Sequence, residues 1–83
     1  GFLVSPDMAQ VERPLARRVI DRVLSLALGR DARIETASIE TCLDGLGKSG
    51  FVSNIQGNLA VSYNKNGLRI EPMDAFRARR KKL

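Results

Sequence analysis

Residues 50–72 read GFVSNIQGNLAVSYNKNGLRIEP, and this stretch decides the fold. Side chains alternate between apolar and polar in two runs of it, as they do in strands that bury one face. Gly57-Asn58 and Asn66-Gly67 separate the runs, and both pairs suit two-residue hairpin loops of type I′ or II′, because such loops need positive φ. The pattern predicts a three-stranded antiparallel meander over residues 51–71, which Pro72 ends.

Upstream of Gly50 the apolar side chains follow the period of a helix. Pro14 suits a first helical turn, and Gly29 suits the position just after a helix end. Between them one half of the helical wheel is apolar, comprising Leu15, Ala16, Val19, Ile20, Val23, Leu24, Leu26 and Ala27. A second apolar stripe, at i, i+3, i+4 and i+7, predicts a shorter helix over residues 36–46. Its members are Ile39, Cys42, Leu43 and Leu46.

These patterns predict an α+β fold, with two helices followed by the meander in one small domain. The chain has 83 residues, which suits a single domain. We expect residues 1–12 to be irregular, residues 13–72 to form the helical hairpin and meander, and residues 73–83 to be a basic tail. The first residue is Gly1 and not Met, so we expect the chain to be a piece of a longer protein.

The composition limits the chemistry that the chain can perform. There is no histidine and only one cysteine, Cys42, so the commonest general base, an internal disulfide and a multi-cysteine zinc site are excluded. We expect no catalytic residue, no metal ligand and no cofactor in this chain. No apolar run approaches the roughly 20 residues of a membrane span, and a cytoplasmic location is expected.

Two local features invite a functional interpretation that their context weakens. The run Gly45-x-Gly47-Lys48-Ser49 is similar to part of a phosphate-binding loop, but it follows a helix and position 42 is not glycine. Cys42 and Tyr63 lie at apolar positions of a helix and a strand, so we interpret both as core residues.

The basic residues are the remaining candidates for function. The chain has 14 Lys and Arg against 9 Asp and Glu, and the excess of five comes from its last seven residues. Those residues form either a solvated tail or an arm that contacts phosphates. The polar arc of the first helix is either a solvated face, with Arg17 paired to Asp21, or a second phosphate-contacting surface. The candidates for RNA contact are Arg17, Arg18, Arg22, Lys48, Arg69, Arg77, Arg79, Arg80, Lys81 and Lys82.

The order of these elements resembles the region that follows the catalytic domain in bacterial tRNA(Ile)-lysidine synthases. In that family a basic amphipathic helix, here residues 14–24, precedes a second helix, here residues 39–46, and a hairpin similar to GNLAVSYNKNGLRIEP. The resemblance covers residues 13–72. The Ser-Gly-Gly-x-Asp-Ser pyrophosphate loop of the family is absent from this chain.

The resemblance implies a non-catalytic fragment that positions tRNA for a catalytic domain in the same parent chain. The parent enzyme would use ATP to ligate lysine to the wobble cytidine of isoleucine tRNA. Two alternatives stay open: an adaptor domain that docks on a protein through its apolar helix face, and a winged-helix-like DNA-binding module. Nucleic-acid binding weakens steeply with salt, whereas docking through apolar area does not.

Overall fold

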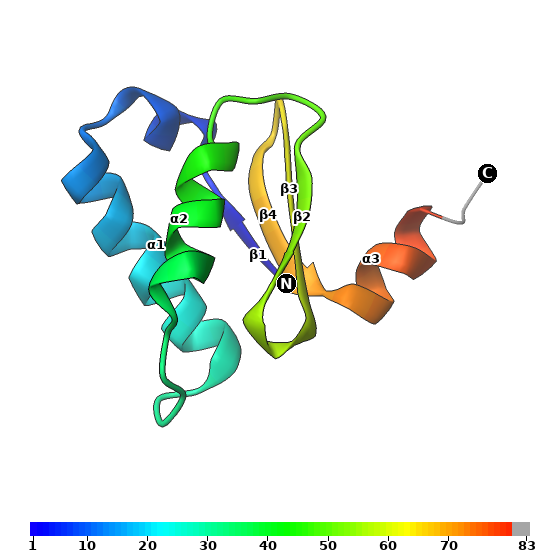
Figure 1. Cartoon of the computed structure of the whole chain (residues 1–83). Coiled ribbons are helices and arrows are strands. Elements are labelled where there is room, and N and C mark those ends of the chain that lie inside the picture. Colours follow the sequence, from blue (N-terminus) through cyan, green and yellow to red (C-terminus); the bar gives the residue numbers. More distant parts are fainter. Residues whose placement is uncertain (81–83) are drawn as a thin grey trace.

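The computed structural model describes residues 1–80, which form an α+β domain (Figure 1). The elements are β1 (Phe2–Val4), η1 (Pro6–Gln10), α1 (Arg13–Leu28), α2 (Thr36–Gly45), β2 (Val52–Ile55), η2 (Gln56–Asn58), β3 (Leu59–Asn64), β4 (Gly67–Pro72) and α3 (Met73–Arg80), where η denotes a 3-10 helix.

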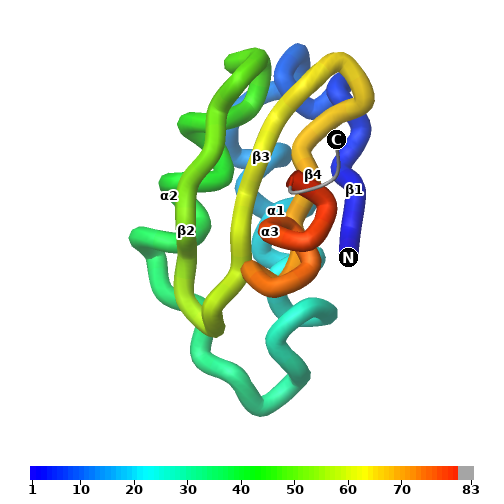
Figure 2. The backbone as a smooth tube through the Cα atoms, turned by 90° about the vertical axis from the view of Figure 1, so that its right-hand side faces the viewer, coloured from blue at the N-terminus to red at the C-terminus, as the bar shows by residue number. Residues whose placement is uncertain are grey.

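The four strands form one antiparallel sheet in the order β1-β4-β3-β2. Helices α1 and α2 cover one face of this sheet, and α3 lies against the opposite face (Figures 1 and 2). The main core fills the space between α1, α2 and the sheet. Its buried members are Val4, Ala16, Ile20, Leu24, Ile39, Cys42, Leu43, Leu59, Val61, Tyr63, Leu68 and Ile70.

The predicted meander is confirmed, with Val61 of β3 lying between Ser53 of β2 and Ile70 of β4. The expected two-residue loop at the first hairpin is wrong, because Ile55 pairs with Leu59 and the connection is Gln56–Asn58. Within it, Gly57 and Asn58 have the expected positive φ, at 72° and 56°. The expected type I′ loop at the second hairpin is wrong. The loop there is Lys65–Asn66, and positive φ occurs one residue later, at Gly67, where φ is 121°.

A close approach of β1 requires glycine at position 67 of this second hairpin. A Cβ atom on Gly67 would overlap the carbonyl oxygen of Val4, so the backbone of β1 passes where a side chain would otherwise lie. The Oδ1 atom of Asn64 accepts a hydrogen bond of 2.8 Å from the backbone N–H of Asn66. This bond between a side chain and the backbone two residues later stabilises the turn.

Both chain ends differ from the prediction. Residues 1–12 are not irregular, because β1 pairs with β4 as a fourth strand and η1 follows it. Residues 73–80, predicted as part of a basic tail, form the helix α3, in which Met73 and Phe76 pack on Ala60. The three residues of β1 are too few to show a period. In α3 only Met73 and Phe76 are large and apolar, which makes a weak helical pattern. Lys81 and Lys82 lie outside the described residues.

The first predicted helix is confirmed as α1, and Gly29 follows it with φ of 101°. Only the centre of its apolar half is buried, at Ala16, Ile20 and Leu24, whereas Leu15 and Leu26 are 49% and 59% exposed. The second helix is confirmed as α2. Within residues 1–80, no helix combines the length and apolar character that crossing a membrane requires.

Candidate nucleic-acid interface

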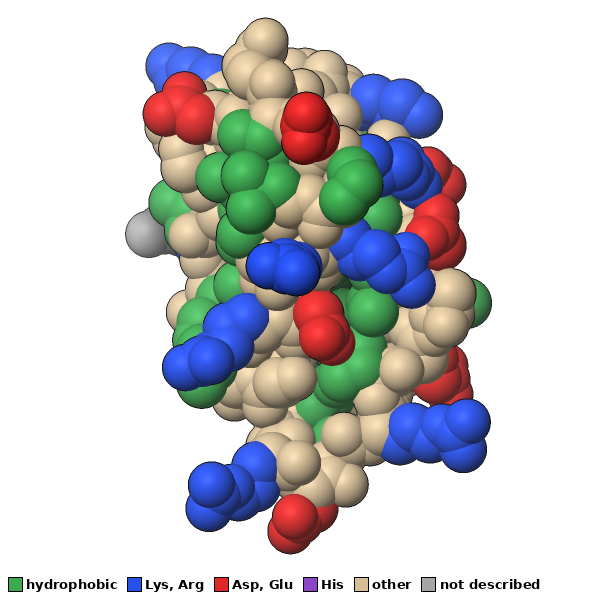
Figure 3. All heavy atoms as spheres, turned by 90° about the vertical axis from the view of Figure 1, so that its left-hand side faces the viewer, with side chains coloured by type: hydrophobic (Ala, Val, Ile, Leu, Met, Phe, Trp, Pro, Cys, Tyr) green, Lys and Arg blue, Asp and Glu red, His purple; other side chains and the backbone are tan. Residues whose placement is uncertain are grey.

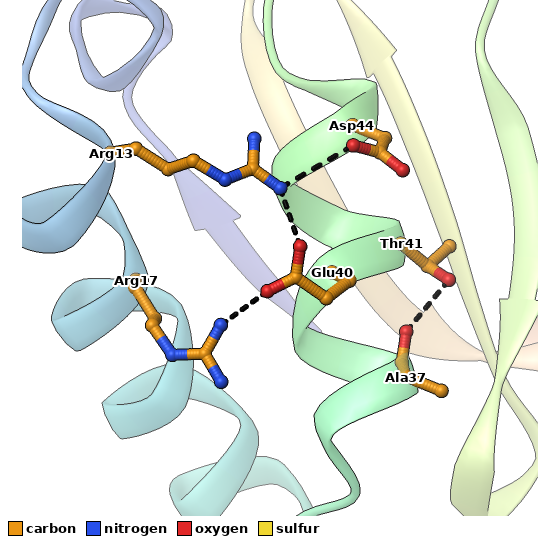
Figure 4. Close-up of polar contacts among 6 residues, drawn as sticks. All are labelled: Arg13, Arg17, Ala37, Glu40, Thr41 and Asp44. Atoms are coloured by element: carbon orange, nitrogen blue, oxygen red, sulfur yellow. Dashed lines mark hydrogen bonds and ion pairs between the residues drawn. The ribbon is translucent and has the colours of Figure 1, made fainter.

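A cluster of ion pairs joins α1 to α2 (Figure 4). Glu40 of α2 accepts hydrogen bonds from Arg13, at 2.5 Å, and from Arg17, and Arg13 also lies 3.5 Å from Asp44. These bonds, the one from Arg13 first, lower the pKa of Glu40 from its ordinary value. Arg17 is therefore engaged between the helices, and within residues 1–80 it forms no ion pair with Asp21.

The other arginines of α1 line an open hollow on its outer surface. The hollow has a volume of about 740 Å³, and three arginines, Arg18, Arg22 and Arg30, are among the residues that line it. In the described part of the chain, no ion pair within 4.0 Å engages any of these three. The rest of the lining is Asp21, Ser25, Leu26 and Gly29. We call this surface the α1 hollow.

Local backbone geometry brings Arg30 to the α1 hollow. Gly29 ends the helix with positive φ, and its N–H donates to the carbonyl of Ser25 at 2.9 Å. The chain then turns, with the N–H of Ala32 bonded to the carbonyl of Gly29. Arg30 was not among the sequence candidates. Its place directly after a C-terminal glycine is the signal that could have suggested it.

The charges on this side of the molecule are mixed. Figure 3 shows blue basic side chains spread over the surface with red acidic and green apolar ones between them. This surface is thus not a single positive field. Any anion that binds it depends on the few arginines that acidic neighbours leave unpaired.

The structure does not bring the other predicted basic residues to the α1 hollow. Arg77, Arg79 and Arg80 belong to α3, across the sheet from α1 (Figure 1). Arg79 pairs with Glu71, and the guanidinium of Arg80 lies 5.3 Å from the centre of the Phe76 ring. Arg69 is half-buried on the α3 side of the sheet, and Lys48 is exposed in the α2–β2 link. Lys81 and Lys82 fall in the part of the chain that the structure does not describe.

The first glycine of the run Gly45-x-Gly47-Lys48-Ser49 is required by packing. Gly45 lies within α2, where a Cβ atom would overlap the ring of Phe51. Cys42 is fully buried in the main core, and this burial raises the pKa of its thiol to about 12. Among residues 1–80 there is no group of three or more His, Cys, Asp or Glu side chains that could hold a metal ion.

Comparison with known proteins does not extend these observations. No protein-family model matches the sequence, and neither a curated protein nor a solved structure matches it. The α1 hollow and the sequence resemblance therefore carry the functional argument.

Proposed function

We propose that this domain is a non-catalytic tRNA-positioning part of a tRNA(Ile)-lysidine synthase-like enzyme. The observation that carries the proposal is the α1 hollow, in which three arginines without an ion-pair partner in residues 1–80 surround one open surface. The resemblance over residues 13–72 supports the same function. A catalytic domain in the parent chain would bind ATP and ligate lysine to the wobble cytidine, in the cytoplasm.

The arrangement suits contact with phosphates. A guanidinium can donate two parallel hydrogen bonds to a phosphate and keeps its charge at every physiological pH. Ile20 and Leu24 are fully buried and fix α1 against the sheet. The backbone that carries Arg18 and Arg22 is therefore rigidly held. Contacts of this kind orient an RNA without reading its sequence, which is the task of a positioning domain.

Two other functions are less well supported. The centre of the apolar face of α1 is buried in the main core at Ala16, Ile20 and Leu24, so this part of the face is not free to dock on a protein partner. Helix α2 carries Glu40 and Asp44 but no Lys or Arg, and acidic side chains would repel the backbone of a DNA groove. This composition weighs against a winged-helix-like module in which α2 reads DNA.

Charge reversal in the α1 hollow tests the proposal. The variant R18E/R22E is compared with K48E/K65E, which makes the same change of charge in the α2–β2 link and the β3–β4 loop. Filter binding of tRNA is measured over a series of salt concentrations. We expect R18E/R22E to weaken binding at least tenfold and to lower the salt slope by about 2, because two phosphate contacts are lost.

The control decides between a defined surface and diffuse attraction. K48E/K65E should keep most of the parent's affinity. Equal losses in the two variants would show that net charge alone governs binding, and unchanged binding in both would refute the proposal. In an ATP–pyrophosphate exchange assay with lysine, we expect this chain alone to be inactive.

A further inference from the structure

We infer that the α1 hollow binds one unpaired nucleotide of RNA, and not the phosphate backbone of a duplex. This inference rests on the proposed function and names the part of the RNA that this site takes. Three properties of the hollow carry it: its size, the apolar side chain in its lining, and the carboxylate among its arginines.

The size of the α1 hollow fits a small group. Sites that hold small molecules typically have volumes of about 300–1,000 Å³, and this one has about 740 Å³. A volume of this size can hold one nucleotide that is splayed out of a loop or a strand end.

An exposed leucine lies among the arginines. Leu26 lines the hollow together with Arg22 and Arg30, and it is 59% exposed. A duplex offers mainly charged phosphates and sugars at its surface, to which a leucine contributes little. The flat face of an unstacked base offers apolar area to Leu26 and a π-surface to the guanidinium planes.

The acidic residue that lines the hollow supports the same inference. Asp21 lies between Arg18 and Arg22 in sequence, and within residues 1–80 it takes part in no ion pair. A carboxylate repels phosphate, so it has no use in a site for duplex backbone alone. It can accept a hydrogen bond from a nucleoside, either from the ribose 2′-hydroxyl or from an exocyclic amino group.

The test compares one RNA in two states. A short single-stranded RNA and the duplex that it forms with its complement are titrated into the chain at fixed salt. Four proteins are used: the parent, Leu26→Ala, Asp21→Asn, and Leu15→Ala as the control, because Leu15 is also exposed on α1 but does not line the hollow. We expect the parent to prefer the single strand by about tenfold or more.

Each variant is expected to change the affinity for RNA in its own way. Leu26→Ala should weaken single-strand binding about threefold or more, through lost apolar contact, and should leave duplex binding unchanged. Asp21→Asn should strengthen duplex binding, because a repulsive charge is removed, while single-strand binding stays equal or falls. Leu15→Ala should behave as the parent does.

Two failures are distinguishable. Equal affinity for duplex and single strand, or equal effects of Leu26→Ala and Leu15→Ala, would overturn the nucleotide inference and leave the proposed function standing. The variant R18E/R22E is titrated as a fifth protein, and if it binds both RNAs as the parent does, both proposals fail together.

Discussion

Arg79 and Glu71 form an ion pair across the junction of β4 and α3, with 2.5 Å between Nη2 and Oε2. The side chain of Glu71 is only 7% exposed, whereas that of Arg79 is 44% exposed. Glu71 pairs with Ala60 in the sheet, and Ala60 is the residue on which Met73 and Phe76 of α3 pack. The ion pair and this small apolar cluster therefore hold α3 on the sheet together.

Removal of the arginine should release α3. Arg79→Ala leaves a buried carboxylate without its partner, and we expect a loss of about 1–2 kcal/mol, because Arg79 is itself partly exposed. Hydrogen exchange of the α3 amides should accelerate more than that of β3 and β4. Arg77→Ala is the control, since Arg77 is exposed and forms no ion pair in the described residues. Equal exchange in the two variants would show that the ion pair does not anchor α3.

The Glu40 cluster predicts a specific acid sensitivity. Because Arg13 and Arg17 lower the pKa of Glu40 in the folded state, its contribution to stability is fully present above its ordinary value of 4.5. That contribution is lost as the pH falls through the lowered pKa. At neutral pH the parent should melt at a higher temperature than Glu40→Gln, and the difference should close as the pH falls below about 4.5.

A matched change controls for general effects of acid. Asp31→Asn removes a carboxylate that is exposed and takes part in no ion pair of residues 1–80. It should melt like the parent throughout this pH range. A difference between the parent and Glu40→Gln that persists unchanged at low pH would contradict the role assigned to this cluster.

Gly67 should tolerate no side chain. In Gly67→Ala the residue keeps an unfavourable φ of 121°, and its Cβ overlaps the carbonyl oxygen of Val4. Gly50→Ala is the control, because Gly50 also has positive φ, at 88°, but has nothing within 4 Å of its Cβ position. Urea unfolding should show a loss of about 1–3 kcal/mol in the control from backbone strain and a larger loss in Gly67→Ala. Equal losses would show that β1 does not press on the second hairpin.

The parts of the fold that follow a local period were predictable, and the parts that depend on distant contacts were not. The helical wheel of α1 and the alternation in β2 and β3 are properties of neighbouring residues. By contrast, Phe2 becomes part of a strand only because Ile70, near the other end of the chain, lies opposite it. The positive φ falls at Gly67, where β1 passes so close that no Cβ atom fits, and the sequence of the hairpin cannot reveal this contact.

The candidate site shows the same division. The basic character of α1 was evident from its residues, and Arg18 and Arg22 line the hollow as neighbouring turns of one helix. The pairing of Arg17 with Glu40 instead of Asp21 depends on how α1 meets α2, and the arrival of Arg30 depends on the turn at Gly29. Sequence periodicity gives the face of a helix but not the neighbours that neutralise its charges.

Cys42 should report on the opening of the core. Its side chain is fully buried and its thiol pKa is raised to about 12, so almost no thiolate is present at about pH 8, where thiol reagents are used. We expect an aromatic disulfide reagent to label the native protein very slowly and to label one thiol rapidly in concentrated guanidinium chloride. The slow native rate should then measure how often the domain unfolds.

Two leucines of α1 test that interpretation. Leu24 is fully buried, so Leu24→Ala should lower the free energy of unfolding by about 2–5 kcal/mol. The labelling rate should then rise about tenfold for every ~1.4 kcal/mol that is lost. Leu15 is 49% exposed, and Leu15→Ala should leave both quantities nearly unchanged. Stability is measured by urea unfolding, and labelling by absorbance. Rapid labelling of the native parent, or equal rates in the two variants, would mean that the reagent reaches Cys42 without unfolding and that α1 and α2 do not seal the core around it.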